Sequence, residues 1–184
     1  MWLKNTLDMK ILMAKKNIVL IGFMGCGKTT VGKELAKNLN FYFVDIDYMI
    51  QKDQNKSIEK IFEVFGEEYF RKLEKNMCYK VSNFKNYVIS TGGGVVKEEQ
   101  NIINLKKSGV IVYLKATPQK IYENLKYDNK RPLLKNKDKF KAICDLLEQR
   151  EYLYEKYADM VFNIEDNSPF VLARNIKSDI QCIL

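Results

Sequence analysis

A glycine-rich stretch between an apolar strand and an amphipathic helix constrains this chain more than any other feature. Residues 22–29 read Gly-Phe-Met-Gly-Cys-Gly-Lys-Thr and satisfy the pattern G-x-x-x-x-G-K-[ST]. They follow the β-branched run Asn17 to Ile21, and after them Val31, Leu35 and Leu39 recur every four residues. Glycines let the backbone approach a ligand closely, and a helix N-terminus offers unpaired N–H groups. The pattern therefore predicts a phosphate-binding loop at a strand–helix turn.

The residue types in this loop predict a bound nucleoside triphosphate with magnesium. Lys28 would reach the β- and γ-phosphates, and the Thr29 hydroxyl would be a Mg²⁺ ligand. The thiol of Cys26 could be exposed near the helix N-terminus, although we expect the residue to act as a small spacer. The chain has neither an N-K-x-D nor a D-x-x-G motif, which argues against a GTPase.

The rest of the chain alternates strand and helix patterns. We predict strands at 17–21, 41–44, 87–90, 110–114 and 160–164, and helices at 57–65, 67–81, 98–107, 139–157 and 169–180, with a further helix that begins at Pro118. Alternating units of this kind predict one α/β domain with a parallel sheet covered on both faces, a three-layer α/β/α arrangement with five strands. Residues 127–137 are polar and irregular. Residues 1–16 precede the first strand, and we expect a poorly ordered extension there, followed by one domain at 17–184.

Composition excludes several classes of protein. There is no histidine, which removes Ser-His-Asp and Cys-His mechanisms and most zinc sites. The four cysteines form no C-x-x-C pair and indicate reduced thiols in a cytoplasmic protein. No apolar run approaches the length of a membrane span. The net charge of +8 is compatible with nucleic acid, membrane or anionic substrates, but the basic residues are dispersed, which favours a lysine-rich solvated surface.

Three later segments could carry chemistry, and each has a simpler reading. Asp45 and Asp47 follow the second strand and, in an extended chain, would point to the same side; one could serve Mg²⁺ through water and the other accept a hydroxyl proton. They could equally cap a helix. The glycines at 92–94 could bring bare N–H groups to a ligand, or form a tight turn. Arg131 could lie on a mobile lid over ATP, although composition alone favours an ordinary surface loop.

Taken together, these segments resemble the shikimate kinase family over nearly the whole chain from Asn17 onward. The resemblance rests on the loop at 22–32, Asp45-Ile46-Asp47, Gly66-Glu67, Phe70-Arg71 with Glu74, Ser90 to Gly94, Arg131 to Leu134 and Arg150 to Tyr157. Their order and spacing are together highly specific. The resemblance implies a P-loop NTPase fold with a mobile lid, ATP as co-substrate, one Mg²⁺ per subunit and shikimate as the phosphate acceptor. It gives no reason to expect nucleic acid or a membrane, and we expect a monomer.

The resemblance also implies roles for particular residues. Asp47 would hydrogen-bond the shikimate hydroxyls and be the candidate base for the 3-hydroxyl. Arg71 and Arg150 would clamp the carboxylate, with N–H groups of the turn assisting, while Phe62 and Phe70 form an apolar wall. The implied binding sets are, for ATP, Gly25, Cys26, Gly27, Lys28, Thr29, Thr30 and Arg131; for shikimate, Asp47, Arg71, Gly92, Gly93, Gly94 and Arg150; for metal, Thr29 and, through water, Asp45. Catalysis would fall to Lys28, Asp47 and Arg131.

One position departs from the family pattern. Many members place a second arginine near the adenine, seven residues before the lid arginine, and this chain has Asn124 there. We expect weaker ATP binding, with Lys126 as a speculative substitute. The alternative functions are another small-molecule kinase, with gluconate or a nucleotide as acceptor, and a nucleotide-gated protein that binds nucleic acid. Arg71 and Arg150 favour an anionic small molecule.

Overall fold

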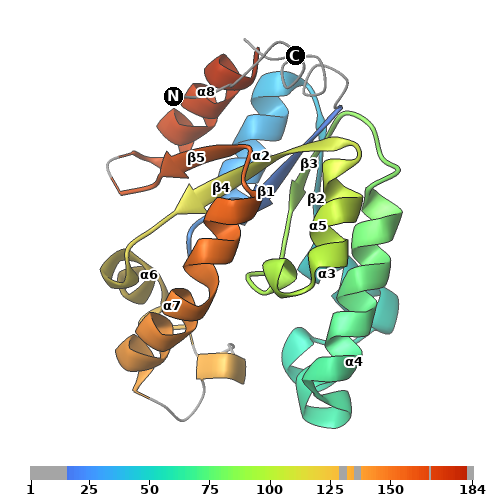
Figure 1. The fold of residues 1–184 in the computed structure, drawn as a ribbon, viewed down its shortest axis with the longest axis vertical. Helices are drawn as coiled ribbons and strands as arrows, with labels where there is room; N and C mark the ends of the chain where they lie inside the picture. The colour runs from blue at the N-terminus through green and yellow to red at the C-terminus, as the bar shows by residue number, and fades with distance from the viewer. Residues whose placement is uncertain (1–15, 129–131, 135–137, 166, 182–184) are drawn as a thin grey trace.

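The sheet at the centre of the molecule has five parallel strands. The computed structural model describes residues 16–128, 132–134, 138–165 and 167–181. The strands run in the order β2-β3-β1-β4-β5, with β1 paired to both β3 and β4 (Figure 1). Their bounds are Asn17–Ile21 for β1, Tyr42–Asp45 for β2, Tyr87–Ser90 for β3, Gly109–Lys115 for β4 and Met160–Asn163 for β5. The five strands and their parallel arrangement confirm the predicted sheet.

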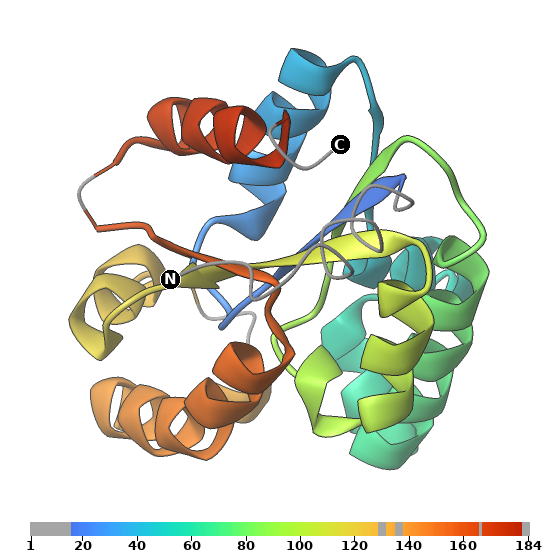
Figure 2. The same ribbon diagram turned by 45° about the horizontal axis from the view of Figure 1, so that its top comes forward.

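Helices cover both faces of this sheet, which is why the central strands are continuous apolar runs. All five residues of β1 are buried. The helices α2 and α8 pack together on one face, and α4, α5 and α7 lie on the other (Figure 2). The helix bounds are Lys28–Leu39 for α2, Ile46–Gln54 for α3, Ile58–Val81 for α4, Glu99–Lys106 for α5, Pro118–Leu125 for α6, Lys139–Tyr157 for α7 and Pro169–Gln181 for α8.

The long helix α4 is two helices joined at Gly66, as predicted. Gly66 has φ 80° and ψ 173°, outside the helical region. A Cβ there would meet no atom within 4 Å, so the position needs glycine for its positive φ and not for space. Ser57 caps the first half, since its hydroxyl accepts the N–H of Lys60 at 3.2 Å.

The second strand begins and ends one residue later than predicted. Asn40 adopts the left-handed conformation at φ 57°, and the next N–H, that of Phe41, donates to the carbonyl of Ala36 at 2.9 Å. Phe41 therefore completes the end of α2 instead of opening β2. At its other end the strand includes Asp45, which is also the N-cap of α3.

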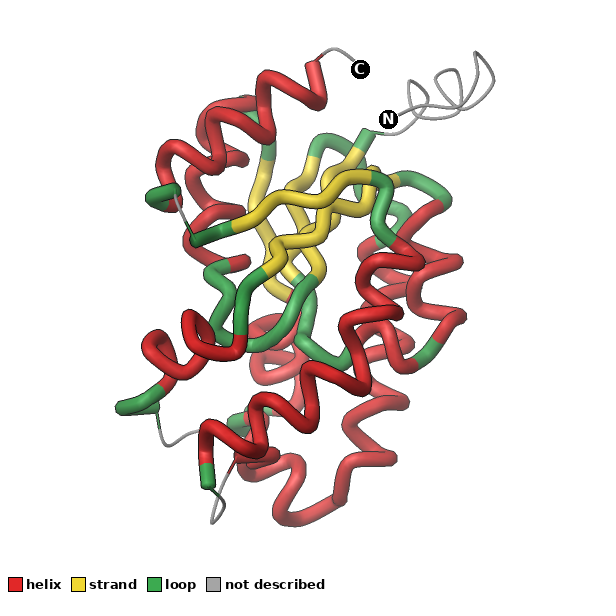
Figure 3. The backbone as a smooth tube through the Cα atoms, turned by 60° about the vertical axis from the view of Figure 1, so that its left-hand side comes forward, coloured by secondary structure: helices red, strands yellow, loops and turns green. Residues whose placement is uncertain are grey.

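The loops that follow β1, β2 and β3 meet at the carboxyl edge of the sheet, where open α/β folds bind ligands. Figure 3 shows these loops in green at one end of the yellow strands, between the helices. They contain the glycine-rich loop, the start of α3 and the turn Thr91 to Gly94. The predicted site residues of all three loops are thereby brought to one edge.

Some expectations fall partly or wholly outside the described residues. These include residues 1–15 of the predicted extension and Arg131 in the predicted lid. Lys16 is joined to the domain, because its N–H donates to Ser108 and its carbonyl accepts from Asn86, both at 2.9 Å. Within the described part of the chain, no helix is both long and apolar enough to cross a membrane.

Candidate active site

The glycine-rich loop has the backbone that its sequence predicts. Gly22 has φ 142°, and a Cβ on it would lie 2.6 Å from the carbonyl oxygen of Leu114 in β4. Gly27 has φ 84° as the N-cap of α2, where a Cβ would meet nothing closer than 4.0 Å. The first glycine is thus required by space and conformation, and the second by conformation alone. The loop passes directly into a helix N-terminus, as a phosphate site needs.

Lys28 is folded back onto this loop. Its ammonium group donates to the carbonyls of Gly22 and Phe23, both at 2.8 Å, and lies 3.6 Å from the Cys26 sulfur. Only 8% of Lys28 is exposed. The Cys26 thiol is buried, so it is not the exposed thiol that the sequence left open, and its small size suits the spacer role.

Asp45 and Asp47 do not share an extended segment, so the predicted reason for their common direction is wrong. The chain is already helical at Ile46, and Asp45 caps α3 by accepting the N–H of Tyr48 at 3.2 Å. Its other oxygen accepts the Thr29 hydroxyl at 2.8 Å. Asp45 is therefore a helix cap, which confirms one of the two alternatives that the sequence offered, and it also contacts Thr29, the other residue expected to serve the metal.

A hollow of about 480 Å³ lies over the glycine-rich loop. Its lining includes Lys28, Thr29, Asp45, Asp47 and Asn124. A neighbouring hollow of about 420 Å³ shares Gly27, Asn124 and Pro169 with it and extends toward α8. The two hollows therefore border each other beside the glycine-rich loop. Asn124 stands on the shared wall, where its side-chain amide donates to the Gly25 carbonyl at 2.9 Å.

A second, smaller pocket of about 70 Å³ contains the predicted acceptor-binding side chains. Its lining is Met24, Asp47, Ile58, Phe62, Phe70, Arg71, Glu74, Gly92, Gly93, Gly94, Leu133 and Arg150. The aromatic rings of Phe62 and Phe70 pack at 4.9 Å. Met24, Asp47 and Gly93 line this pocket and the phosphate hollow alike, so the two spaces meet at Asp47.

The arginines of this pocket are held by other side chains. Arg71 donates to Glu74 at 2.7 Å and to Glu67 at 3.0 and 3.2 Å. Arg150, which is 3% exposed, donates to the Gly93 carbonyl at 3.4 Å and lies 5.8 Å above the ring of Phe23. Two guanidinium groups with fixed directions suit a planar carboxylate.

Charge in this pocket is shaped by burial. Desolvation raises the pKa of the fully buried Glu74 carboxyl, and the neighbouring Arg71 only partly offsets this. Burial also opposes ionisation of Glu67, but hydrogen bonds from Lys97 and Arg71 outweigh it and lower the pKa of that carboxyl. Burial would lower the pKa of Arg71, yet the charge of Glu74 and the contacts to Glu67 raise it, so Arg71 stays charged.

The turn at 92–94 is tight because protein atoms surround it. A Cβ on Gly92 would lie 2.8 Å from carboxylate oxygens of Asp47 and Glu74, and one on Gly94 would lie 2.5 Å from the Arg71 guanidinium. None of these three glycines has a positive φ. All three positions need glycine because other protein atoms approach closely: side chains of the pocket at Gly92 and Gly94, and the main-chain nitrogen of Met24 at 2.9 Å from a Cβ on Gly93. This is the tight turn that the sequence offered as the alternative to a ligand contact.

Two residues of this site were given no role by the sequence. Glu74 is buried at the base of the acceptor pocket; its spacing of three residues from Arg71 is the signal for a helical ion pair. Tyr154 is buried against the glycine turn, and no local pattern indicates that contact.

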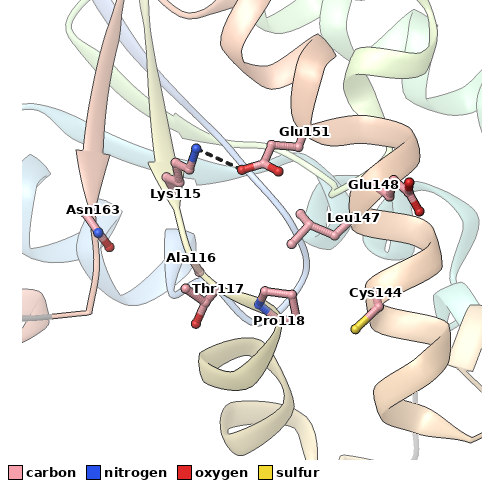
Figure 4. A pocket seen from close by; sticks show the side chains of 9 residues that line it. All are labelled: Lys115, Ala116, Thr117, Pro118, Cys144, Leu147, Glu148, Glu151 and Asn163. Carbon is pink, nitrogen blue, oxygen red and sulfur yellow. Dashed lines mark ion pairs between the residues drawn. The ribbon is translucent and has the colours of Figure 1, made fainter.

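Elsewhere, a separate hollow of about 340 Å³ lies between the end of β4 and α7 (Figure 4). None of the predicted site residues lines it.

Fold and loop together define the class of protein: a P-loop α/β protein with a second pocket beside the glycine-rich loop. Comparisons give the family. A family model described as shikimate kinase matches residues 24–181. A shikimate kinase of Caldanaerobacter subterraneus subsp. tengcongensis is 51% identical over 83% of this chain and 89% of its own. One from Caldicellulosiruptor saccharolyticus is 48% identical over 89% of this chain and 94% of its own. The chain belongs to the shikimate kinase family.

Solved structures agree with this assignment. A shikimate kinase from Acinetobacter baumannii in complex with shikimate superposes with a TM-score of 0.88 at 33% identity, covering 95% of this chain and 97% of that one. A gluconokinase from Sinorhizobium meliloti gives a TM-score of 0.59 at 11% identity, covering 92% of this chain and 93% of that one. The second likeness shows the fold alone.

Proposed function

We propose that this protein transfers the γ-phosphate of ATP to the 3-hydroxyl of shikimate, giving shikimate 3-phosphate and ADP. The observation that carries the proposal is the meeting of two spaces at Asp47: a phosphate hollow on one side and a pocket with two arginines on the other. A carboxylic acid held by Arg71 and Arg150 would present its hydroxyls toward Asp47 and the phosphates.

The proposed reaction is mainly one of positioning. The acceptor hydroxyl oxygen bonds to the γ-phosphorus while the bond from that phosphorus to the β,γ-bridging oxygen breaks, and its electron pair leaves with ADP. Asp47 orients the hydroxyl or takes its proton. Lys28 exchanges the carbonyls of Gly22 and Phe23 for phosphate oxygens, where its charge offsets the charge that develops on transfer.

The residues present also fit Mg²⁺. The Thr29 hydroxyl and an Asp45 carboxylate oxygen lie 2.8 Å apart on the wall of the phosphate hollow, and both are hard oxygen donors. Within the described residues, no group of three or more cysteine or acidic side chains is arranged as a metal cage. That suits an ion held by one or two protein oxygens together with water and phosphates. When bound, the ion would neutralise part of the triphosphate charge.

The proposal is tested with purified protein in an assay that couples ADP release to NADH oxidation. Shikimate, gluconate and a nucleoside monophosphate are each supplied with ATP and Mg²⁺. We expect turnover with shikimate and background rates with the other two acceptors. Turnover with gluconate or the nucleotide, but not shikimate, would replace the proposed acceptor while keeping the class of reaction.

Oligomeric state belongs to the same proposal. We expect a monomer, because described residues of a single chain line both the phosphate hollow and the acceptor pocket. Light scattering during gel filtration measures the mass in solution, and a monomer should give the mass of one chain, 21.6 kDa.

A further inference from the structure

One main-chain carbonyl in the acceptor pocket is held by α7. Within the turn at 92–94, the carbonyls of Gly92 and Gly94 accept N–H groups of the turn that follows, from Val95 and Lys97. The Gly93 carbonyl instead accepts the hydroxyl of Tyr154 and, at 3.4 Å, the guanidinium of Arg150. Its direction therefore depends on the helix that carries the predicted carboxylate clamp.

Tyr154 is built to hold this carbonyl. It is fully buried, and its ring stacks on Tyr113 at 5.1 Å. Burial raises the pKa of the Tyr154 hydroxyl far above its usual value, so the hydroxyl keeps its proton and stays a donor. It lies one helical turn after Arg150 on α7, so both donors reach the same carbonyl from one face.

The helix α7 is also held in place by two glutamates, each one residue after Arg150 or Tyr154. Lys115, at the end of β4, forms ion pairs with Glu151 at 2.9 Å and Glu155 at 2.7 Å. Figure 4 shows the first of these pairs, with Lys115 and Glu151 facing each other across the gap between β4 and α7. These two ion pairs fix α7 against the sheet, and they therefore keep Tyr154 beside the glycine turn.

The direction of the Gly93 carbonyl also sets the direction of the next N–H, that of Gly94. In a trans peptide the C=O and the next N–H point in opposite directions. The Gly93 carbonyl faces Tyr154, so the Gly94 N–H points away from it, and this N–H has no acceptor among the described residues. The Gly94 α-carbon lies against Arg71, since a Cβ there would be 2.5 Å from both terminal guanidinium nitrogens. A carboxylate on Arg71 would therefore lie beside the Gly94 N–H.

We propose that Tyr154 is a positioning residue for carboxylate recognition: by holding the Gly93 carbonyl, it aims the Gly94 N–H and the Arg150 guanidinium at the acceptor carboxylate. This inference rests on the proposed function, because it needs a carboxylate acceptor in the pocket. Tyr154 does not touch the acceptor and acts only through Gly93, Gly94 and Arg150.

The matched test compares Tyr154→Phe with Tyr113→Phe. Both changes remove one buried hydroxyl from the same stacked pair, but the Tyr113 hydroxyl has no hydrogen-bond partner within the described residues. Loss of the Tyr154 hydrogen bond should raise the KM for shikimate about five- to tenfold. The KM for ATP should change less than about twofold, as should both constants in Tyr113→Phe. Equal shikimate KM values in the two variants would overturn the inference.

A second readout separates recognition from a general loss of structure. Shikimate methyl ester lacks the carboxylate charge, so Tyr154→Phe should reduce kcat/KM for shikimate but leave the weak use of the ester nearly unchanged. A parallel loss with both acceptors would mean a purely structural role. This ratio does not depend on the fraction of active protein, so incomplete folding does not spoil it.

The wild-type protein provides a readout that needs no variant. In ¹⁵N-labelled protein, shikimate should shift the amide resonance of Gly94 downfield, and the methyl ester should shift it less. An unmoved Gly94 resonance under saturating shikimate would overturn the inference. If wild-type protein fails to phosphorylate shikimate at all, the proposed function fails instead, so the two failures are distinguishable.

Discussion

Lys28 is the residue whose surroundings must change most when a nucleotide enters. Its ammonium group holds two loop carbonyls at 2.8 Å, and phosphate oxygens would replace them. Lys28→Met removes the charge that offsets phosphate transfer, so we expect kcat to fall roughly 10²- to 10³-fold. The coupled assay measures the rate, and circular dichroism checks the fold. Lys72→Met is the control, because Lys72 is exposed and forms an ion pair with the exposed Glu68 at 2.9 Å.

Arg150 tests the acceptor pocket at the same scale. Arg150→Lys keeps the positive charge but loses the planar fork that binds two carboxylate oxygens. We expect the KM for shikimate to rise about tenfold or more, with the KM for ATP unchanged. Steady-state kinetics with each substrate varied in turn give both constants. Arg174→Lys on the exposed side of α8 should alter neither, and an unchanged shikimate KM in Arg150→Lys would remove Arg150 from the clamp.

The sequence identified these residues by type and order, but it could not identify every partner. Lys28, Arg71 and Arg150 belong to motifs, and the structure brings all three to the predicted edge. Glu74 and Tyr154 lie on helices where a glutamate or tyrosine reads the same whether it faces solvent or core. Packing of α4 and α7 against the glycine turn decides that, and packing depends on residues distant in sequence.

At the scale of elements, local signals predicted the strands and helices well. Five short, mostly apolar runs gave the strands, and Gly66 divided α4 as expected. The exception is α3, Ile46–Gln54, a helix that was not predicted from the sequence. Asp45 and Asp47 fit an extended pair as well as a helix start, and spacing alone could not choose between them. The hydrogen bond from the Tyr48 N–H to Asp45 decides it, because that bond forms only when the chain turns at once.

The double duty of Asp45 can be divided by two substitutions. Asparagine caps helices as well as aspartate does, so Asp45→Asn should keep thermal stability while raising the Mg²⁺ concentration needed for half-maximal rate. Asp45→Ala should raise that concentration too and also destabilise the fold by about 1 kcal/mol. Magnesium titrations and thermal melts measure the two effects.

Ser57→Ala is the matched control for capping alone. It removes the cap of α4 at a residue that does not line the phosphate hollow, and should lower stability by about 1 kcal/mol with no change in the Mg²⁺ requirement. If Asp45→Asn and Ser57→Ala both left the Mg²⁺ requirement untouched, Asp45 would be a helix cap only.

For the whole molecule, the parallel sheet followed from the sequence, but its strand order and the position of the two pockets beside each other did not. Alternating strands and helices predicted a parallel sheet with ligands at its carboxyl edge. That Met24, Asp47 and Gly93 line both spaces depends on how three loops pack against one another. Such contacts join segments far apart in the chain, and no local pattern encodes them.

The buried Glu74 should make the stability of the whole protein depend on pH. Its carboxyl faces Arg71, and the charges of Lys97 and Arg150 reach it, yet burial raises its pKa above the usual value of 4.5. The folded protein therefore binds this proton more tightly than the unfolded chain. The stabilisation is fully present below pH 4.5 and is lost as pH rises toward the raised pKa of the folded state.

Glu74→Gln removes this titration, so the melting temperature of the variant minus that of the wild type should increase as pH rises above 4.5. Expressed as a difference in the free energy of unfolding, the change should not exceed about 1.4 kcal/mol per pH unit. Thermal melts between pH 4.5 and 7.5 measure it. Glu68→Gln is the control, since the hydrogen bond with Lys72 and the charge of Lys72 lower the pKa of that exposed carboxyl, which leaves the difference flat above pH 5. A flat difference for Glu74→Gln would contradict the raised pKa.

The border between the two spaces at Asp47 also matters for inhibitor design. The space over the glycine-rich loop and the space beside Arg71 share Met24, Asp47 and Gly93 as lining. A two-headed compound, with a carboxylated ring joined to a nucleoside through a short phosphate-length tether, could occupy both spaces. Its second head would bind at the high effective concentration set by the first, so its affinity should exceed that of either half by orders of magnitude.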